Sequence, residues 1–342
     1  MPSSLNPKLE TMLAETSNKI CGCKGIRSCR LCKNTENEVQ ALFTGNHNVQ
    51  SNVEKKTCYF CVHCKKAYQY TRVDSLAEDQ SLQSSFPECQ NEDLPNNTSV
   101  PSPGATSNVL ELKEDNKLCQ HKNVLHKMNF PGITIIENFV SPDEEFSLDA
   151  AIKETPFQKS QSGRQKQDFG PKVNFKKQKI RVSSFNGLPS YSRFLFERMG
   201  AHSCLKDFQP VELCNLEYCS ERGAHIDPHF DDAWLWGERL VTLNLMSDSC
   251  LTFTLDEDPF LEVRVPLLRR SLIVVSAEAR YQWKHGISEA DVIGRRVAMT
   301  FRELSEEFSR GGSKEEEGKH LLTLALTFQG TAIQPSNVPH WD

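Results

Sequence analysis

The stretch "GAHIDPHFDDAW", residues 223–234, contains the same three-residue pattern twice. His225 and Asp227 form one His-x-Asp, and His229 and Asp231 form another four residues later. A His and an Asp two residues apart on a β-strand point to the same side of that strand. With one further His, such a pair places two imidazoles and one carboxylate on one face of a metal ion, and leaves positions open for O2 and a substrate. The stretch therefore indicates an iron site, with either pair as its ligands.

Short apolar segments follow one another after residue 208 with no helix between them. They read "PVELCNLEYC", "RLVTLNLMS", "CLTFTL", "LEVRVPL", "SLIVVS" and "RRVAMTFREL". Several strands at such short spacing indicate a sandwich, a barrel or a jelly roll. A helix is expected after the N-cap Ser141 and Pro142, and a closing helix in "KEEEGKHLLTLALTFQ". The sequence thus predicts an α+β, mainly β domain over residues 124–330, followed by a tail at 331–342.

A third metal ligand and a cosubstrate site are expected near the end of this domain. His285 follows "SLIVVS", and strands that are far apart in a jelly-roll sequence lie side by side. Arg296 and Arg302 are six residues apart, so both face one side of a strand, whereas Arg295 faces the other side. Arginine binds carboxylates through two parallel hydrogen bonds, which favours a dicarboxylate beside the metal. Salt bridges to acids such as Glu303 are the alternative.

The bulk composition is ordinary for a soluble protein. The chain has 342 residues, 38% of them hydrophobic, and a formal net charge of -5, which gives no general attraction to nucleic acid. We see no secretory signal, and no apolar run reaches the roughly 18 residues of a membrane span. We therefore expect a cytoplasmic and nuclear protein with no membrane partner. In those compartments the 13 cysteines are not expected to form disulfides.

Nine of the cysteines lie in the first 119 residues. "CGCKGIRSCRLC" supplies four predicted ligands for tetrahedral zinc: Cys21, Cys23, Cys29 and Cys32. "CYFCVHC" supplies three more cysteines without a clear fourth ligand: Cys58, Cys61 and Cys64. His63 or His47 could complete this second group, or the group could complete the first site. Residues 1–70 are predicted to form a small Cys-rich module that binds Zn(II), with an iron–sulfur cluster or free thiols as alternatives.

Residues 71–123 differ from both flanking regions in composition. They are rich in Ser, Asn, Pro and acidic residues and contain few large apolar ones. Such a segment cannot bury enough surface to offset the entropy of ordering it, so we predict a disordered linker. Cys89 and Cys119 then have no assigned role.

From about residue 130 to 305 the chain resembles the AlkB-like family of iron(II)- and 2-oxoglutarate-dependent dioxygenases. The matching segments are "CNLEYCSERGAHIDPHFDD", "SLIVVSAEARYQWKHGI" and "RRVAMTFREL". The resemblance implies a double-stranded β-helix, which is a jelly roll, and agrees with the predicted strands. It also implies Fe(II), 2-oxoglutarate and O2 as cofactors, and an N-demethylase that releases formaldehyde and succinate.

The resemblance also assigns roles to individual residues. Family members place an aliphatic residue three positions before the metal-binding His, as Ile226 stands before His229. Three iron ligands, which are also the catalytic residues, follow from this match: His229, Asp231 and His285. Three residues are implied to bind 2-oxoglutarate: Tyr218, Arg296 and Arg302. The chain departs from the family in three places. Asn215 stands one residue too far from Tyr218 for the family's Asn-x-Tyr, and Ala298 replaces a frequent Asn. The loop from Tyr218 to His229 is longer than usual, with Glu221 and Arg222 as the extra residues.

Residues 159–181 contain eight Lys or Arg and one Asp, with aromatic residues between them. In AlkB-like proteins this position forms a lid over the substrate. The resemblance therefore implies a set of substrate-binding residues: Arg164, Gln167, Phe169, Lys172, Lys176 and Lys177. A basic hairpin with aromatic residues suits single-stranded nucleic acid, and it suits an acidic protein surface equally well.

The most similar branch of the family is associated with methyl-lysine in actin and with methyladenine in DNA. The resemblance thus implies a methylated protein, with actin or actomyosin as the suspected partner, or methylated DNA. We favour the protein because the net charge is negative and no basic segment lies outside residues 159–181. A catalytically weak protein that uses this fold and the Cys-rich module to bind a partner is the alternative from another class.

Overall fold

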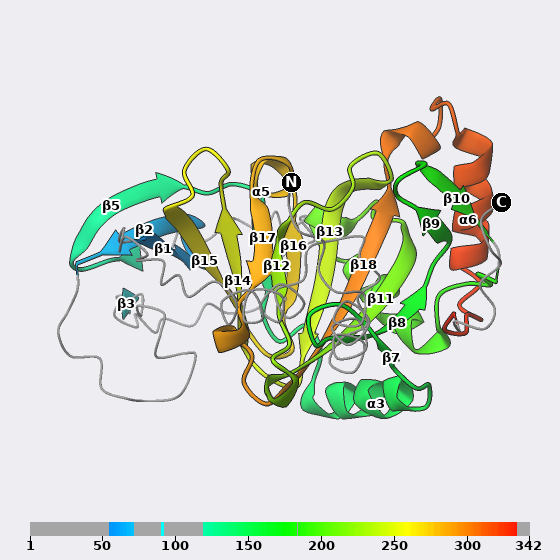
Figure 1. The fold of residues 1–342 in the computed structure, drawn as a ribbon, viewed down its shortest axis with the longest axis horizontal. Helices are drawn as coiled ribbons and strands as arrows, with labels where there is room; N and C mark the ends of the chain where they lie inside the picture. The colour runs from blue at the N-terminus through cyan, green and yellow to red at the C-terminus, as the bar shows by residue number, and fades with distance from the viewer. Residues whose placement is uncertain (1–54, 72–89, 92–118, 183, 334–342) are drawn as a thin grey trace, which may run out of the picture.

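The computed structural model describes residues 55–71, 90–91, 119–182 and 184–333. Two seven-stranded sheets form its body (Figure 1). The major sheet runs in the order β6 (Ile133–Ile136), β16 (Leu272–Val275), β13 (Trp236–Leu245), β18 (Arg295–Leu304), β11 (Pro210–Cys219), β8 (Gln165–Phe169) and β7 (Gln158–Lys159). The minor sheet runs in the order β12 (Ile226–His229), β17 (Lys284–Ile287), β14 (Ser249–Thr254), β15 (Leu261–Leu267), β1 (Lys56–Cys61), β2 (Lys66–Tyr70) and β5 (Val124–Asn129).

The remaining elements are short or lie outside the two sheets. The α-helices are α3 (Pro142–Lys153), α4 (Arg193–Met199), α5 (Ala277–Tyr281) and α6 (Glu315–Ala325). Two small strand pairs are β9 (Lys172–Asn174) with β10 (Lys179–Arg181), and β3 (Gln90–Asn91) with β4 (Cys119–Gln120). The 3-10 helices are η2 (Ser190–Ser192), η3 (Ser203–Leu205), η4 (Ser220–Arg222), η5 (Glu289–Asp291) and η6 (Glu306–Phe308). Within the described part of the chain, no helix combines the length and the apolar character required to cross a membrane.

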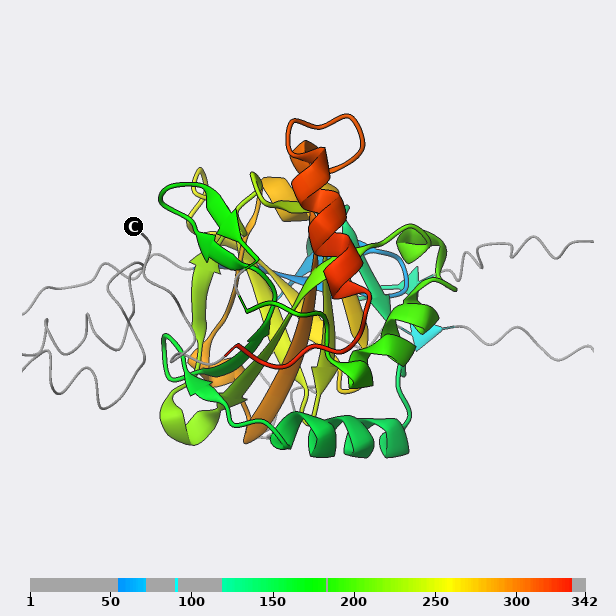
Figure 2. The same cartoon turned by 90° about the vertical axis from the view of Figure 1, so that its right-hand side faces the viewer.

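The inner faces of the two sheets enclose a pocket lined by residues of both. On β18, Arg296, Ala298, Thr300 and Arg302 face this pocket, and Val297, Met299 and Phe301 between them are buried on the other face. The alternation follows from the two-residue period of a strand. It confirms that Arg296 and Arg302 share a side. Figure 2 shows α6 in front of the major sheet, on the side turned away from the minor sheet, and α3 along the lower end of the strands.

The expected helix after Ser141 is α3, and its start has the predicted cap. The Ser141 side chain accepts a hydrogen bond from the Glu144 amide at 3.1 Å, and the Glu144 carboxylate accepts one from the Ser141 amide at 2.8 Å. These reciprocal bonds satisfy two amides that the first turn leaves unpaired. The closing helix is also present, as α6.

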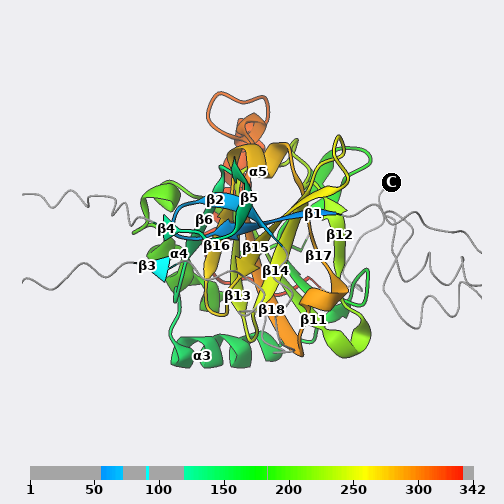
Figure 3. The same ribbon diagram turned by 90° about the vertical axis from the view of Figure 1, so that its left-hand side faces the viewer.

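The predicted boundary between the Cys-rich module and the main domain, at residue 70, differs from the structure. The strands β1 and β2, which precede this boundary, belong to the minor sheet. β1 pairs in parallel with β15, with Lys56 opposite Leu261. Phe60 on β1 packs against Phe130, whose ring also contacts Phe253 and Trp283 at centroid distances of 5.3 and 5.0 Å. Figure 3 shows β1, β2 and β5 together at the outer end of the minor sheet. Residues 56–70 therefore share one core with the domain that follows.

Parts of the predicted module and linker lie outside the described residues. Residues 1–54 contain the predicted zinc ligands Cys21, Cys23, Cys29 and Cys32, and residues 72–89 and 92–118 make up most of the predicted linker. The tail is described only as far as residue 333. Within the predicted linker, β4 pairs with β3, so this short stretch is part of a strand pair.

Glu145 on α3 attaches this helix to the turn between β13 and β14. Its carboxylate is 2% exposed and accepts hydrogen bonds from the Met246 amide at 2.7 Å and from Arg269 at 2.8 Å. Burial alone would raise the pKa of this carboxyl, but Arg269 and the Met246 amide outweigh burial and lower it. The carboxylate therefore contributes stability in its ionised form.

We predict that Glu145→Ala lowers the free energy of unfolding by about 1–3 kcal/mol, because it leaves the Met246 amide buried without an acceptor. Urea denaturation at neutral pH measures this loss. Because the folded-state pKa lies below the unfolded value, the loss is largest above about pH 5 and shrinks as the pH falls through the folded-state pKa. Glu154→Ala, an exposed change of the same charge at the end of α3, is the control. Equal losses in the two variants would contradict the role of Glu145.

Candidate metal centre

Two histidines and one aspartate converge on the inner side of the minor sheet. His229 ends β12, Asp231 follows two residues later, and His285 lies on the neighbouring strand β17. His229 and His285 are opposite each other in the antiparallel pairing, and their ring centroids are 4.6 Å apart. One ligand atom from each of the three residues lies within 4.8 Å of the others. The structure thus brings together the set expected from the sequence.

Gly286 allows β12 to approach β17 closely enough for this arrangement. A Cβ atom at this position would lie 2.7 Å from the carbonyl oxygen of Ile226 and 2.9 Å from the nitrogen of Pro228. Both distances are to backbone atoms, so a side chain would force the strands apart. The glycine after His285 therefore fixes the distance between His285 and His229, a role that sequence reasoning missed.

Hydrogen bonds orient the three side chains for a metal. The His229 Nδ1 lies 2.8 Å from the carbonyl oxygen of Asp227, which leaves Nε2 of His229 for a ligand bond. One carboxylate oxygen of Asp231 lies 3.3 Å from His285 Nε2, and the other accepts a hydrogen bond from Arg302 Nε at 2.9 Å. His225 lies outside this group, with its Nδ1 at 2.8 Å from the carbonyl oxygen of Gly223. The second His-x-Asp is thus the one in the site.

The charge of Asp231 is held by its neighbours. Burial opposes ionisation of the Asp231 carboxyl, but Arg302, His285 and His229 outweigh burial and hold its pKa well below the usual range. The same contacts act on Arg302, where burial would lower the pKa but Asp231 and Glu212 raise it. The expected alternative partner, Glu303, instead pairs with Arg239 at 2.7 Å. Asp231 is therefore an anion at neutral pH, as a metal ligand must be.

Arg296 lies deeper in the same pocket and lacks a carboxylate partner. It is 1% exposed, its Nε donates to Asn244 Oδ1 at 2.5 Å, and its guanidinium lies 4.9 Å from the Tyr218 ring centroid. Within the described residues, its Nη1 has no hydrogen-bond partner. Burial lowers the pKa of Arg296. A buried cation with an unpaired donor fits an anionic ligand that enters the pocket.

No family model matches the chain, but the chain is similar to several characterised proteins. It is 37% identical to the α-ketoglutarate-dependent dioxygenase alkB homolog 4 of Mus musculus, over 92% of this chain and 96% of the mouse protein. The protein of that name from Homo sapiens is 47% identical over 60% of this chain and 77% of its own length. A DNA N6-methyl adenine demethylase of Caenorhabditis elegans is 34% identical over 90% of this chain and 95% of its own length.

The chain belongs to the AlkB family. The jelly-roll fold expected from the sequence is confirmed, and so are the expected cofactors of a 2-oxoglutarate-dependent dioxygenase: Fe(II), 2-oxoglutarate and O2. The residues fit these groups. Two imidazoles and one carboxylate leave the remaining iron positions open, and the unpaired guanidinium of Arg296 suits a carboxylate of 2-oxoglutarate.

The other two residues predicted to bind the cosubstrate also line the pocket between the two sheets. Tyr218 and Arg302 both face it. The departure at Asn215 has a structural explanation, since its side chain points to the other face of β11 and donates to Gln167 and Tyr191 at 2.9 and 2.7 Å. Leu216, two residues before Tyr218, takes the pocket-facing position instead. The cosubstrate pocket is thus more apolar here than an Asn-x-Tyr would make it.

Two predicted substrate-binding residues are placed differently by the structure. Gln167 is 1% exposed and donates to the carbonyl oxygens of Ile152 and Thr155, so its amide holds the end of α3. Phe169 is 3% exposed and packs edge-to-face on Tyr191. Neither side chain can contact a substrate, because β8 is part of the major sheet and both residues point into its covered face. The prediction for these two residues is wrong.

The remaining four lid residues differ in exposure. Arg164 is largely buried, with its guanidinium 5.9 Å from the Tyr218 ring centroid. Lys172 on β9 is half-buried, and Lys176 and Lys177 are exposed in the turn between β9 and β10. Their role in substrate binding stays a prediction.

Three charged residues around the site escaped sequence reasoning. Arg280 is 1% exposed and donates to the backbone carbonyl of Asp231 at 2.9 Å, which fixes the peptide that carries the carboxylate. Glu212 accepts from Arg302 at 2.7 Å, and Asp168 accepts from Cys214 at 3.2 Å. Glu212 and Tyr218 are six residues apart on one strand, so the sequence could have shown that both face the same side. The partners of Arg280 and Asp168 follow only from the fold.

We predict that His229→Ala or Asp231→Ala abolishes Fe(II)-dependent succinate formation from 2-oxoglutarate, because each removes one of three ligands. His225→Asn is the matched control, since its amide can still donate to the Gly223 carbonyl. It should keep most of the turnover and the absorbance band of the iron–2-oxoglutarate complex. Equal loss in His225→Asn and His229→Ala, with both folded by circular dichroism, would overturn the ligand assignment.

Arg296→Lys should raise the KM for 2-oxoglutarate about tenfold or more, near 1.4 kcal/mol, because lysine keeps the charge but loses the two-pronged donor. Steady-state kinetics of succinate formation measure this change. Arg295→Lys is the control on the same strand, because Arg295 faces the other side and pairs with Glu217 and Asp149. A KM that changes equally in both variants would show that Arg296 has a structural role.

Proposed function

We propose that this dioxygenase removes N-methyl groups from methylated lysine side chains of a protein, with actin as the suspected substrate. When bound, Fe(II) together with 2-oxoglutarate and O2 supplies the hydroxylation of the methyl carbon, which then leaves as formaldehyde while 2-oxoglutarate becomes succinate and CO2. The protein residues hold the metal and the cosubstrate, and they place the methylated nitrogen beside them.

The observation that carries the proposal is a group of carboxylates beside the metal residues, one of them partly exposed. Glu212 on β11 has the same parity as the pocket residue Tyr218, and Asp168 on β8 lies opposite Cys214, which shares that parity. Arg302 contacts both Asp231 and Glu212, so one positive charge faces two carboxylates. Asp168 pairs with Lys166 at 2.5 Å, and the side chain of Asp168 is still 32% exposed.

A methylated lysine complements this charge pattern. Asp231 and Glu212 face Arg302, and Asp168 pairs with Lys166. Of these carboxylates, Asp168 is partly exposed. A protonated methylamine that approaches Asp168 would be attracted by its charge at short range, whereas neutral methyladenine would not.

The basic hairpin β9–β10 offers a second contact area. It stands above the ends of the major-sheet strands in Figure 2, and its exposed residues include Phe175, Lys176, Lys177, Lys179 and Arg181. Gly170, at the base of the hairpin, packs on Glu212, whose Cγ lies 2.8 Å from the position of a Cβ there. The base of the hairpin thus contacts Glu212, which pairs with the Asp231 partner Arg302. An acidic protein surface around the methylated lysine would match its charge.

Demethylation of N6-methyladenine in DNA is the second candidate function. It is supported by the name of the Caenorhabditis elegans relative and by the basic hairpin. Single-stranded DNA binding relies on aromatic rings that stack on bases. Of the two phenylalanines in residues 159–181, Phe169 is buried and Phe175 is 41% exposed. This favours the protein substrate.

We predict that Asp168→Asn lowers kcat/KM for a methyl-lysine peptide about five- to tenfold, because it removes one negative charge near the cationic nitrogen. Lys166→Gln is the matched variant. It removes the positive charge that pairs with Asp168, so it should raise kcat/KM. Formaldehyde release and the loss of the methyl mass from the peptide measure both changes. Uncoupled decay of 2-oxoglutarate should stay unchanged, since neither residue contacts His229, Asp231 or His285.

An N6-methyladenine oligonucleotide assayed in parallel separates the two candidates. Demethylation of the oligonucleotide but not of the peptide, with an affinity that falls steeply as salt rises, would replace the methyl-lysine proposal by the DNA one. A decrease in kcat/KM for the peptide in both Asp168→Asn and Lys166→Gln would show that the pair is structural.

A further inference from the structure

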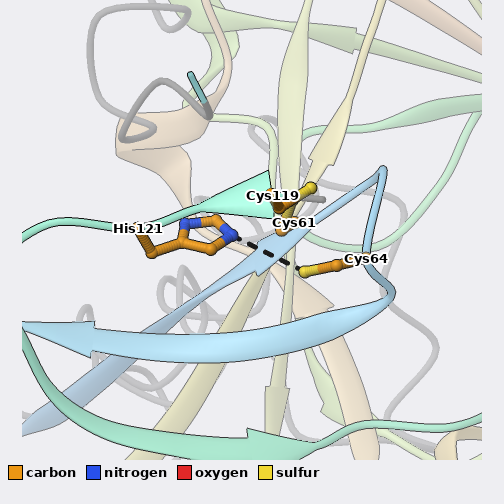
Figure 4. Close-up of side chains that lie close together, drawn as sticks. All are labelled: Cys61, Cys64, Cys119 and His121. Carbon is orange, nitrogen blue, oxygen red and sulfur yellow. Dashed lines mark hydrogen bonds between the residues drawn. The ribbon is translucent and has the colours of Figure 1, made fainter. Parts of the chain in front are cut away.

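A second group of metal-ligating side chains lies far from the iron site, at the outer end of the minor sheet. Cys61 ends β1, Cys64 lies in the turn that leads to β2, Cys119 lies on β4, and His121 follows it. Figure 4 shows the four side chains turned toward a common centre. One ligand atom from each lies within 4.8 Å of all the others. The cluster thus joins part of the second cysteine group to two residues of the predicted linker.

The separations between these atoms fit a tetrahedral zinc ion. The sulfurs of Cys61 and Cys119 are 3.9 Å apart, and Cys64 Sγ lies 3.6 Å from His121 Nε2. A disulfide would require about 2.0 Å between sulfurs. With Zn–S bonds of about 2.3 Å and a Zn–N bond of about 2.0 Å, the edges of a tetrahedron are about 3.8 Å for S–S and about 3.5 Å for S–N. The two edges given above are close to these values, and the other separations are within 4.8 Å.

Neighbouring tyrosines hold the imidazole in the orientation that such a site needs. The hydroxyl of Tyr70 lies 2.8 Å from His121 Nδ1, which directs Nε2 toward the three sulfurs. The His121 ring stacks on Tyr68 with centroids 3.8 Å apart and an interplanar angle of 24°. The Tyr68 hydroxyl in turn lies 3.1 Å from Cys64 Sγ. Metal-bound histidines are regularly fixed by a hydrogen bond at the other ring nitrogen.

We propose that Cys61, Cys64, Cys119 and His121 bind one structural Zn(II) ion. Three thiolates and one imidazole complete a tetrahedron and leave no position for a substrate, which is the pattern of structural rather than catalytic zinc. The fully buried Cys58 does not join, because its side chain packs in the core near β15. The site is independent of the proposed methyl-lysine activity.

The zinc ion would tie two distant parts of the chain to each other. Cys61 and Cys119 are 58 residues apart in the sequence, and the residues after His121 lead into β5, which pairs with β2. Closing so long a loop costs entropy that the pairing of β2 with β5 must otherwise offset. A metal bound only by the folded chain adds its binding free energy to folding. The ion therefore holds the outer strands of the minor sheet in place.

The test is the metal content of the purified full-length protein, measured by mass spectrometry of the elements. We expect Cys119→Ser to lose about one zinc per chain relative to the wild type. Cys204→Ser, outside the cluster, should lose none. The loss should be the same in a background in which Cys21, Cys23, Cys29 and Cys32 are all serine. A loss that disappears in that background, or no loss at all in Cys119→Ser, overturns the proposal.

Substitutions of the histidine separate metal binding from a folding defect. His121→Cys supplies a fourth thiolate and should retain the zinc, whereas His121→Ala should lose it. Substitution of cobalt(II) in the wild type should give the intense visible bands of tetrahedral coordination with thiolate charge transfer, and these should weaken in Cys64→Ser. Equal zinc loss in His121→Cys and His121→Ala, or the visible absorbance of an iron–sulfur cluster in anaerobically purified protein, would overturn the assignment to zinc.

Discussion

The contact between Arg302 and Asp231 is the interaction on which the catalytic end of this protein depends. A carboxylate buried between two sheets is costly unless a cation and hydrogen bonds compensate it. Arg302 provides the positive charge and a hydrogen bond to one oxygen of Asp231, and the other oxygen faces His285. Arg302 lies on β18, the middle strand of the major sheet, and Arg280 holds the loop after β12 at the Asp231 carbonyl.

The same arginine connects the metal residues to the base of the basic hairpin. Arg302 also contacts Glu212, and Glu212 packs against Gly170 at the base of the basic hairpin. Arg296, six residues earlier on the same face, has no such acidic partner among the described residues. One strand thus carries an arginine paired with two carboxylates and another whose Nη1 has no hydrogen-bond partner among the described residues.

The outer strands of the minor sheet belong to the same folding unit as the site. β1 pairs with β15, and Phe60 joins the aromatic cluster of Phe130, Phe253 and Trp283 beneath the strand that carries His285. The Cys61, Cys64, Cys119 and His121 cluster closes the far edge of this sheet, where β2 and β5 pair. A metal there would stabilise one end of the sheet, whereas the iron residues lie at the opposite end, on and beside β12 and β17. The two groups would then use metals for different purposes.

The sequence by itself determined the strands of the catalytic domain and the face of each residue on them, because a two-residue period is local. That is why β11, β15 and β18 match their predicted segments, why Arg296 and Arg302 share a side, and why α3 begins at its predicted cap. Local patterns could not show which remote groups meet. Gln167 and Phe169 were predicted to be lid residues, but both lie on β8, a strand of the major sheet. Their side chains point to the covered face, where Gln167 donates to the Ile152 carbonyl of α3. Cys119 and His121 carried no signal beside Cys61 and Cys64, since only the pairing of β2 with β5 brings residues so far apart in the chain within bonding distance of one metal.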